Sequence, residues 1–139
     1  MTQTLNARPT ISTIDLDNLA FNLRSVREFI GAEVKCLAVV KADAYGHGAV
    51  ECSRRLEREG VDWLGVALPE EGVELRNAGI ERPILVLGSF WPGQESDVID
   101  AGLTPVVYTV EQAALLDSAA RSAGRIADYH VKIDTGMGR

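Results

Sequence analysis

The stretch CLAVVKADAYGHGAVECSRRLEREG, residues 36–60, has the pattern of one strand, one turn and one helix in succession. Its first part, residues 36–42, is an apolar run of strand length that does not alternate with polar residues, which is typical of a parallel strand covered on both faces. A helical pattern follows the glycine-containing turn and ends at Gly60, as helices with a glycine C-cap do. The stretch therefore predicts one complete βα unit.

The same rhythm continues along the chain. Further apolar runs of strand length lie at residues 63–67, 84–89, 105–109 and 129–134. Helical patterns lie between them at residues 69–79, 92–102 and 109–124, and each ends on a glycine. Pro69 and Pro92 suit first-turn positions, and Thr109 with Gln112 forms a capping-box pattern.

Upstream of the first unit, the chain predicts a strand and a helix. ISTIDL, residues 11–16, is a candidate short strand, and residues 17–31 carry apolar side chains at three- and four-residue steps. We expect Asp17 to cap this helix at its N-terminus and Gly31 to end it.

The alternation of strands and helices predicts an α/β fold with a parallel sheet, built as one domain over residues 1–139. Five units are too few for a closed eight-stranded barrel of about 250 residues. They suffice for an open doubly wound sheet, and composition alone favours that arrangement.

Charge and composition exclude several classes of protein. The net charge of −6 argues against nucleic acid and against anionic membrane surfaces as partners. The first 13 residues contain no apolar signal-peptide core, and no apolar run approaches the roughly 20 residues that span a bilayer. We therefore expect a cytoplasmic protein, in which Cys36 and Cys52 are reduced core thiols.

Lys41 ends the apolar run, and this is where parallel α/β folds bind ligands. A lysine amine is a nucleophile only when neutral, and apolar neighbours such as Val39, Val40 and Ala42 favour the neutral form. The alternative is a lysine that only extends its amine into solvent at a strand end.

The turn after Lys41 adds further candidate ligand groups. Gly46 and Gly48 allow a close approach of the backbone to an anion, and Tyr45 brings a hydroxyl group. We expect a packing or hydrogen-bonding role for His47, a capping role for Asp43, and no metal site. The alternative is a helix-entry turn that binds no ligand.

Two long motifs, AVVKADAYGHG at residues 38–48 and YHVKIDTGMGR at residues 129–139, closely resemble the alanine racemase family. Residues 13–31 resemble the family's N-terminal strand and first helix, and residues 65–88 its second and third barrel units. The resemblance implies the N-terminal portion, about five βα units, of a TIM-type (β/α)8 barrel. The remaining units and the C-terminal β domain are absent, so residues 1–139 would form one partial domain.

The resemblance also implies an activity. Members are homodimeric isomerases that depend on pyridoxal 5'-phosphate and interconvert L-alanine and D-alanine, which supplies D-alanine for peptidoglycan. Lys41 matches the lysine that binds the cofactor covalently and serves as one of two opposed acid/base groups. Tyr45 matches a tyrosine at the cofactor phosphate, and Arg139 matches an arginine near the substrate carboxylate.

Lys132 matches a position that is a carbamylated lysine in some members. Alternation along residues 129–134 would place His130, Lys132 and Asp134 on the interior face, with Val131 and Ile133 facing the helices. A carbamylated Lys132 could pair with Arg139. A plain Lys132 could instead pair with Asp134 or another nearby carboxylate.

The family's second catalytic base is a tyrosine from the partner subunit, in a part of the fold that this sequence does not contain. We therefore expect residues 1–139 to be inactive alone. The alternatives are a pyridoxal-phosphate-binding barrel protein without racemase activity, a non-catalytic half-barrel, and a related racemase of serine or of broad specificity.

Overall fold

The computed structural model describes residues 10–138, which form a parallel five-stranded sheet and six helices. The strands pair in the order β1-β2-β3-β4-β5. They are β1 (Leu37–Val39), β2 (Trp63–Val66), β3 (Ile84–Val86), β4 (Thr104–Val107) and β5 (His130–Val131). The helices are α1 (Leu16–Ile30), α2 (Lys41–Gly46), α3 (Ala49–Arg58), α4 (Pro69–Asn77), α5 (Glu95–Asp100) and α6 (Val110–Ser122).

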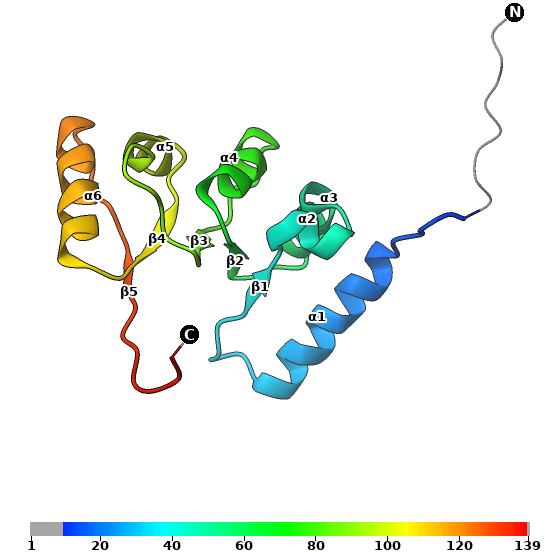
Figure 1. Cartoon of the computed structure of the whole chain (residues 1–139). Coiled ribbons are helices and arrows are strands. Elements are labelled where there is room, and N and C mark those ends of the chain that lie inside the picture. Colours follow the sequence, from blue (N-terminus) through cyan, green and yellow to red (C-terminus); the bar gives the residue numbers. More distant parts are fainter. Residues whose placement is uncertain (1–9, 139) are drawn as a thin grey trace, which may run out of the picture.

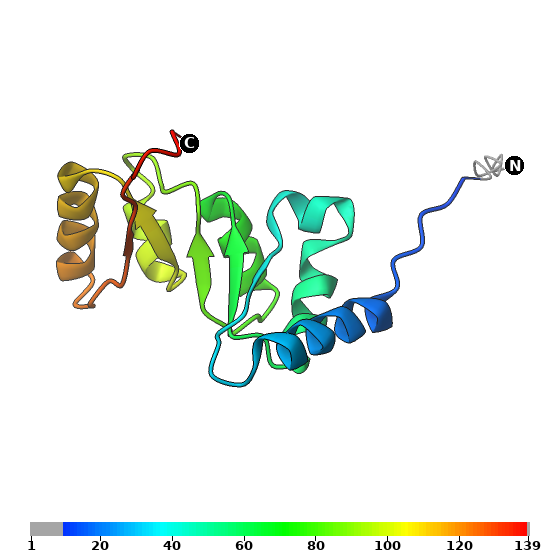
Figure 2. The same cartoon turned by 90° about the horizontal axis from the view of Figure 1, so that it is seen from below.

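The sheet is an arc of a barrel. Figure 1 shows the strands following a curve with α3, α4, α5 and α6 on its convex side, and Figure 2 shows the inner face of the sheet without a layer of helices over it. A doubly wound sheet would reverse its strand order at one point and carry helices on both faces. The open doubly wound arrangement that composition favoured is therefore wrong, and the portion of a (β/α)8 barrel is confirmed.

The core lies between the sheet and the outer helices. Four residues of β2 and β3, Leu64, Val66, Ile84 and Val86, are completely buried, and Leu75 of α4 packs in the same cluster. These strands are apolar throughout, as the sequence predicted. One of their faces packs against the outer helices, and on the other face the side chains of Leu37, Val39 and Leu87 lie around Gly65.

The chain before α1 differs from the prediction. Residues 11–15 form no strand, and Ile11 is 82% exposed, because none of the described strands lies beside this segment to share hydrogen bonds. The helix begins at Leu16, and its N-cap is Asp15, whose side chain accepts hydrogen bonds from the N–H groups of Asp17 and Asn18. The prediction that Asp17 is the N-cap was wrong, whereas the prediction that Gly31 is the C-cap is confirmed.

The predicted ends of the other helices are mostly confirmed. Gly60, Gly79, Gly102 and Gly124 all have positive φ after their helices, and Pro69 is the first residue of α4. Pro92 is not in a first turn, since α5 begins only at Glu95. None of the helices in residues 10–138 combines the length and apolarity that a bilayer crossing requires.

The last strand is shorter than its pattern predicted. β5 comprises only His130 and Val131, so regular alternation does not extend through residue 134. Val131 and Ile133 are 64% and 75% exposed, so they do not pack under the helices as expected. Among the described residues no helix follows β5 that could cover these side chains. The strand itself is cut short by a turn at Asp134, whose Oδ1 accepts hydrogen bonds from the N–H groups of Gly136 and Gly138.

Candidate functional site

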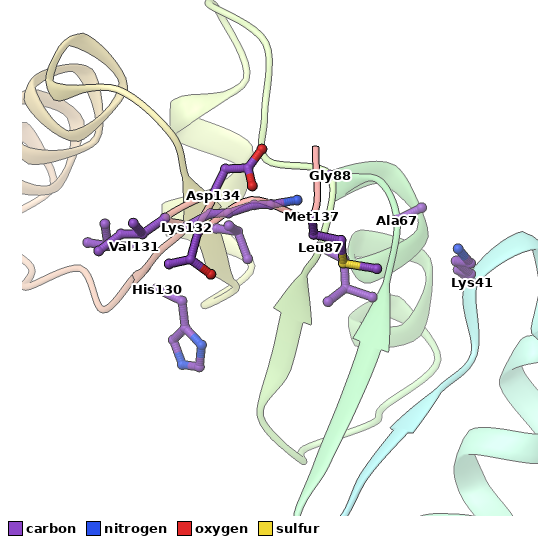
Figure 3. A pocket seen from close by; sticks show the side chains of 12 residues that line it. Lys41, Ala67, Leu87, Gly88, His130, Val131, Lys132, Asp134 and Met137 are labelled. Carbon is purple, nitrogen blue, oxygen red and sulfur yellow. The ribbon is translucent and has the colours of Figure 1, made fainter. Parts of the chain in front are cut away.

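Lys41 lies directly after β1 and Val40, at the C-terminal end of the sheet, and is half-buried. Its side chain lines a pocket of about 750 Å³ together with Ala67, Leu87 and Gly88, which follow β2 and β3. The opposite wall is the segment from His130 to Thr135, with Met137. Figure 3 shows Lys41 and Lys132 approaching this pocket from opposite sides.

Two of the loops at this pocket are in close contact. A Cβ atom added to Gly88 would collide with the carbonyl oxygen of Ala67, and the N–H of Gly88 donates to that same oxygen at 3.0 Å. Only glycine allows the two backbones to approach this closely. The loops after β2 and β3 are therefore held in contact where they line the pocket.

Lys41 is followed by a left-handed turn that the sequence patterns did not predict. Ala42, Asp43, Ala44 and Tyr45 have φ between 50° and 57° and ψ between 36° and 53°. Residues other than glycine rarely adopt this conformation, which costs roughly 1–2 kcal/mol per residue. Such strain persists only where surrounding contacts fix it, and it concentrates at functional sites.

Several hydrogen bonds hold this turn. The N–H of Ala44 donates to the carbonyl of Val40 at 2.9 Å, and the N–H of Ala49 donates to Asp43 Oδ1 at 2.7 Å. His47 Nδ1 lies 2.8 Å from the carbonyl oxygen of Ala44. The predicted capping role of Asp43 and hydrogen-bonding role of His47 are confirmed.

Tyr45 does not line the pocket of Lys41. Its side chain is 60% exposed and lines another pocket, of about 560 Å³, between α1, β1, α3 and residues 12–15. Arg139, the candidate substrate-binding residue, lies outside the described residues. Of the four residues singled out in the sequence, the structure thus brings Lys41 and Lys132 to one pocket.

Lys132 is surrounded by groups that the sequence patterns did not connect with it. Its Nζ lies 5.7 Å from the centroid of the Tyr108 ring, over the ring, and the Tyr108 hydroxyl donates to the carbonyl of Leu87 at 2.9 Å. The contact favours a charged amine, because an aromatic face attracts cations. His130 packs its ring against Trp63, with centroids 5.8 Å apart.

Asp134 is held as an anion at the rim of the pocket. Hydrogen bonds from the N–H groups of Gly138 and Gly136 lower the pKa of its carboxyl below the usual range, and the charge of Lys132 lowers it further. Its carboxylate oxygen Oδ1 is therefore committed to its own turn.

Glu71 is a residue of this site that sequence reasoning missed. It stands in the first turn of α4, and its two oxygens bind backbone N–H groups of two different loops, including that of Ala42. Its position three residues after Leu68 could have indicated a capping residue. No sequence pattern shows that its other oxygen reaches a residue 29 positions away.

Comparison with known proteins gives one consistent result. Residues 14–139 match the family model for the N-terminal domain of alanine racemase. An alanine racemase of Geobacter sulfurreducens is 47% identical over 135 residues, which cover 97% of this chain and 35% of the relative. An alanine racemase of Halothermothrix orenii is 46% identical over 132 residues, covering 95% of this chain and 35% of the relative.

Solved structures agree. Alanine racemase of Clostridium difficile in complex with cycloserine superposes with a TM-score of 0.88 at 45% identity, over 94% of this chain and 37% of that one. Alanine racemase of Bartonella henselae, with covalently bound pyridoxal phosphate, superposes with a TM-score of 0.79 at 26% identity, over 91% of this chain and 35% of that one. The chain thus spans about a third of the length of the proteins it matches.

Proposed function

Because the chain belongs to the alanine racemase N-terminal domain family, we propose that it supplies the cofactor-binding lysine of an enzyme that interconverts L-alanine and D-alanine. The observation that carries the proposal is the position of Lys41 in a pocket at the C-terminal end of the sheet. A cytoplasmic homodimer that provides D-alanine for peptidoglycan is part of the same proposal.

The described residues fit pyridoxal 5'-phosphate. Lys41 brings a primary amine, the group that reacts with an aldehyde, to a pocket whose volume of about 750 Å³ lies in the range of small-molecule sites. Lys132 adds a cationic side chain at the same pocket, which suits a ligand carrying a phosphate.

Lys41 has two tasks in this proposal. Its Nζ would hold the cofactor covalently, and the same amine, once released, would take or return the Cα proton on one face of the substrate. The cofactor, when bound, supplies the electron sink for the carbanion left at Cα. Tyr45 at the cofactor phosphate and Arg139 at the substrate carboxylate are further assignments of this proposal.

Chemical labelling tests the proposal that the cofactor binds covalently to Lys41. The chain contains three lysines that could be labelled, Lys35, Lys41 and Lys132. After incubation with pyridoxal 5'-phosphate, borohydride reduction and peptide mapping should find the pyridoxyl group on Lys41. A label mainly on Lys35 or Lys132 would contradict the assignment.

Turnover separates the enzyme from a cofactor-binding protein without activity. A full-length protein that contains this segment should convert L-alanine to D-alanine, and the Lys41→Ala variant should not. Residues 1–139 alone should bind the aldehyde at Lys41 but fail to racemise alanine at a comparable rate, because Tyr45 lies outside the pocket of Lys41 and offers no opposed base there. Turnover by these residues alone would mean that they contain a second base.

Carbamylation of Lys132 stays a prediction. The Tyr108 ring beside Nζ favours the charged amine, whereas a carbamate would be anionic. A carbamate carbon resonance after incubation with ¹³C-bicarbonate, absent from a Lys132→Arg variant, would decide for carbamylation.

A further inference from the structure

Glu71 joins two loops of the candidate site through one carboxylate. Its Oε2 accepts hydrogen bonds from the N–H groups of Ala67 at 2.7 Å and Leu68 at 3.1 Å, which caps the start of α4. Its Oε1 accepts a hydrogen bond of 2.7 Å from the N–H of Ala42. The first pair is an ordinary capping interaction, but the bond to Ala42 reaches across to another βα unit.

The bond to Ala42 is made at the start of the left-handed turn, directly after Lys41. Ala42 directly follows Lys41, so the bound N–H belongs to the peptide group that joins the two residues. Ala42 is also the first residue of the left-handed turn, with φ 50° and ψ 53°. A strained turn needs contacts that fix it, and a hydrogen bond to a charged acceptor is stronger than one to a neutral acceptor.

We propose that Glu71 is a positioning residue for Lys41. It does not line the pocket, and it acts by holding the backbone on the C-terminal side of Lys41 while it fixes Ala67, which does line the pocket. The direction of the Lys41 side chain toward the pocket then depends on a carboxylate in a different unit of the barrel.

The chemistry of the carboxylate makes the proposal specific. Both of its oxygens are acceptors, and each is used by N–H donors. In Glu71→Gln only one side-chain oxygen remains. The amide NH₂ group replaces the other oxygen, and because it is itself a donor it cannot accept a hydrogen bond from a backbone N–H. The variant can keep the cap of α4 or the bond to Ala42, but not both.

Hydrogen exchange tests the first step without any ligand. In Glu71→Gln we expect the one remaining oxygen to stay with the two donors of the cap, the N–H groups of Ala67 and Leu68, rather than with the single donor Ala42. The amide proton of Ala42 should therefore exchange about tenfold faster or more, because a bond to a charged group is lost. Glu70→Gln is the matched control, since it removes the same charge from the neighbouring residue, whose Oε1 instead accepts from Gln94 Nε2 at 2.6 Å. Equal exchange of Ala42 in both variants would overturn the proposal.

The buried amide of Leu64, which donates to the carbonyl of Pro83, reports whether the sheet stays folded. If Glu71→Gln loses protection at Leu64 as well, Glu71→Asp takes its place. Aspartate keeps the charge at the start of α4, and its shorter side chain cannot serve both loops, so faster exchange at Ala42 is again the expected result.

Lysine reactivity tests the second step, which rests on the proposed function. After reaction with pyridoxal 5'-phosphate and borohydride, the share of label on Lys41, relative to Lys35 and Lys132, should fall several-fold in Glu71→Gln and stay unchanged in Glu70→Gln. Faster exchange at Ala42 with an unchanged share on Lys41 would overturn the positioning role. Absence of Lys41 labelling in the unsubstituted chain would instead contradict the proposed function, and the exchange result would then decide on Glu71.

Discussion

Ala42 is an alanine in a conformation that glycine adopts without steric cost. Ala42→Gly should raise the free energy of unfolding by up to about 1 kcal/mol, since the relief of strain exceeds the entropy that glycine adds to the unfolded chain. Ala42→Val should lower it by about 1–2 kcal/mol, because a β-branched side chain adds strain at positive φ. Urea unfolding of both variants measures the two changes.

The matched control for the valine variant is Ala123→Val. Ala123 is also exposed and lies at a helix end, but its φ is −85°. Its effect should stay within about 0.5 kcal/mol, as at most surface positions. Similar losses at positions 42 and 123 would show that the left-handed conformation is not the cause.

Asp134 makes the rim of the pocket sensitive to acid. Its pKa is lowered by the N–H groups of Gly138 and Gly136 and by Lys132, so the carboxylate stabilises the turn above its unfolded pKa. That contribution is lost as the pH falls through the lowered folded-state pKa. In an NMR titration the amide resonances of Gly136 and Gly138 should shift with a midpoint below the usual aspartate range, and Asp134→Asn should abolish the transition.

At the scale of single elements, α1 offers a direct comparison of two neighbouring carboxylates. Asp15→Ala should cost about 1 kcal/mol of stability, because it removes the side chain that accepts from the N–H groups of Asp17 and Asn18. Asp17→Ala should cost less, since Asp17 is 87% exposed on its side chain and pairs with Arg55 at the surface. Thermal unfolding of both variants measures the difference, and a larger loss from Asp17→Ala would contradict the assignment of the cap.

The elements themselves were predictable where local chemistry determines them. Each predicted helix from residue 49 onward exists, because apolar periodicity and a following glycine are properties of a short segment. The strand at residues 11–16 was wrong because a strand needs a neighbour, and sequence alone does not say whether one is there. The order of the strands and the curvature of the sheet likewise depend on contacts between units, which composition does not contain.

In the candidate site, too, features set by local sequence could be predicted and features set by contacts between distant segments could not. Lys41 at a strand end could be found from the pattern, as could the cap made by Asp43. The left-handed turn could not be predicted, because two of its residues, Ala42 and Ala44, are alanines, and alanine does not indicate positive φ. The contacts of Glu71 with Ala42 and of Lys132 with Tyr108 join segments far apart in the sequence, so only the folded chain shows them.

At the scale of the whole molecule, the arc leaves two strand edges and its inner face uncovered within the described residues (Figure 2). Edge strands with unpaired N–H and C=O groups favour pairing with other chains. We expect residues 1–139 alone to self-associate, and sedimentation velocity over a range of concentrations should show the sedimentation coefficient rising with concentration. A concentration-independent monomer would contradict this expectation.

The strand order has a consequence for the way the protein is made. Each strand from β2 to β5 pairs with the strand immediately before it in the sequence. During synthesis on the ribosome, the strand with which each new strand pairs has therefore already been made. No strand from β2 to β5 depends on a later part of the chain for its first partner. The strand order therefore allows the arc to grow in the order in which its codons are read, with the N-terminal part of the chain available to fold first.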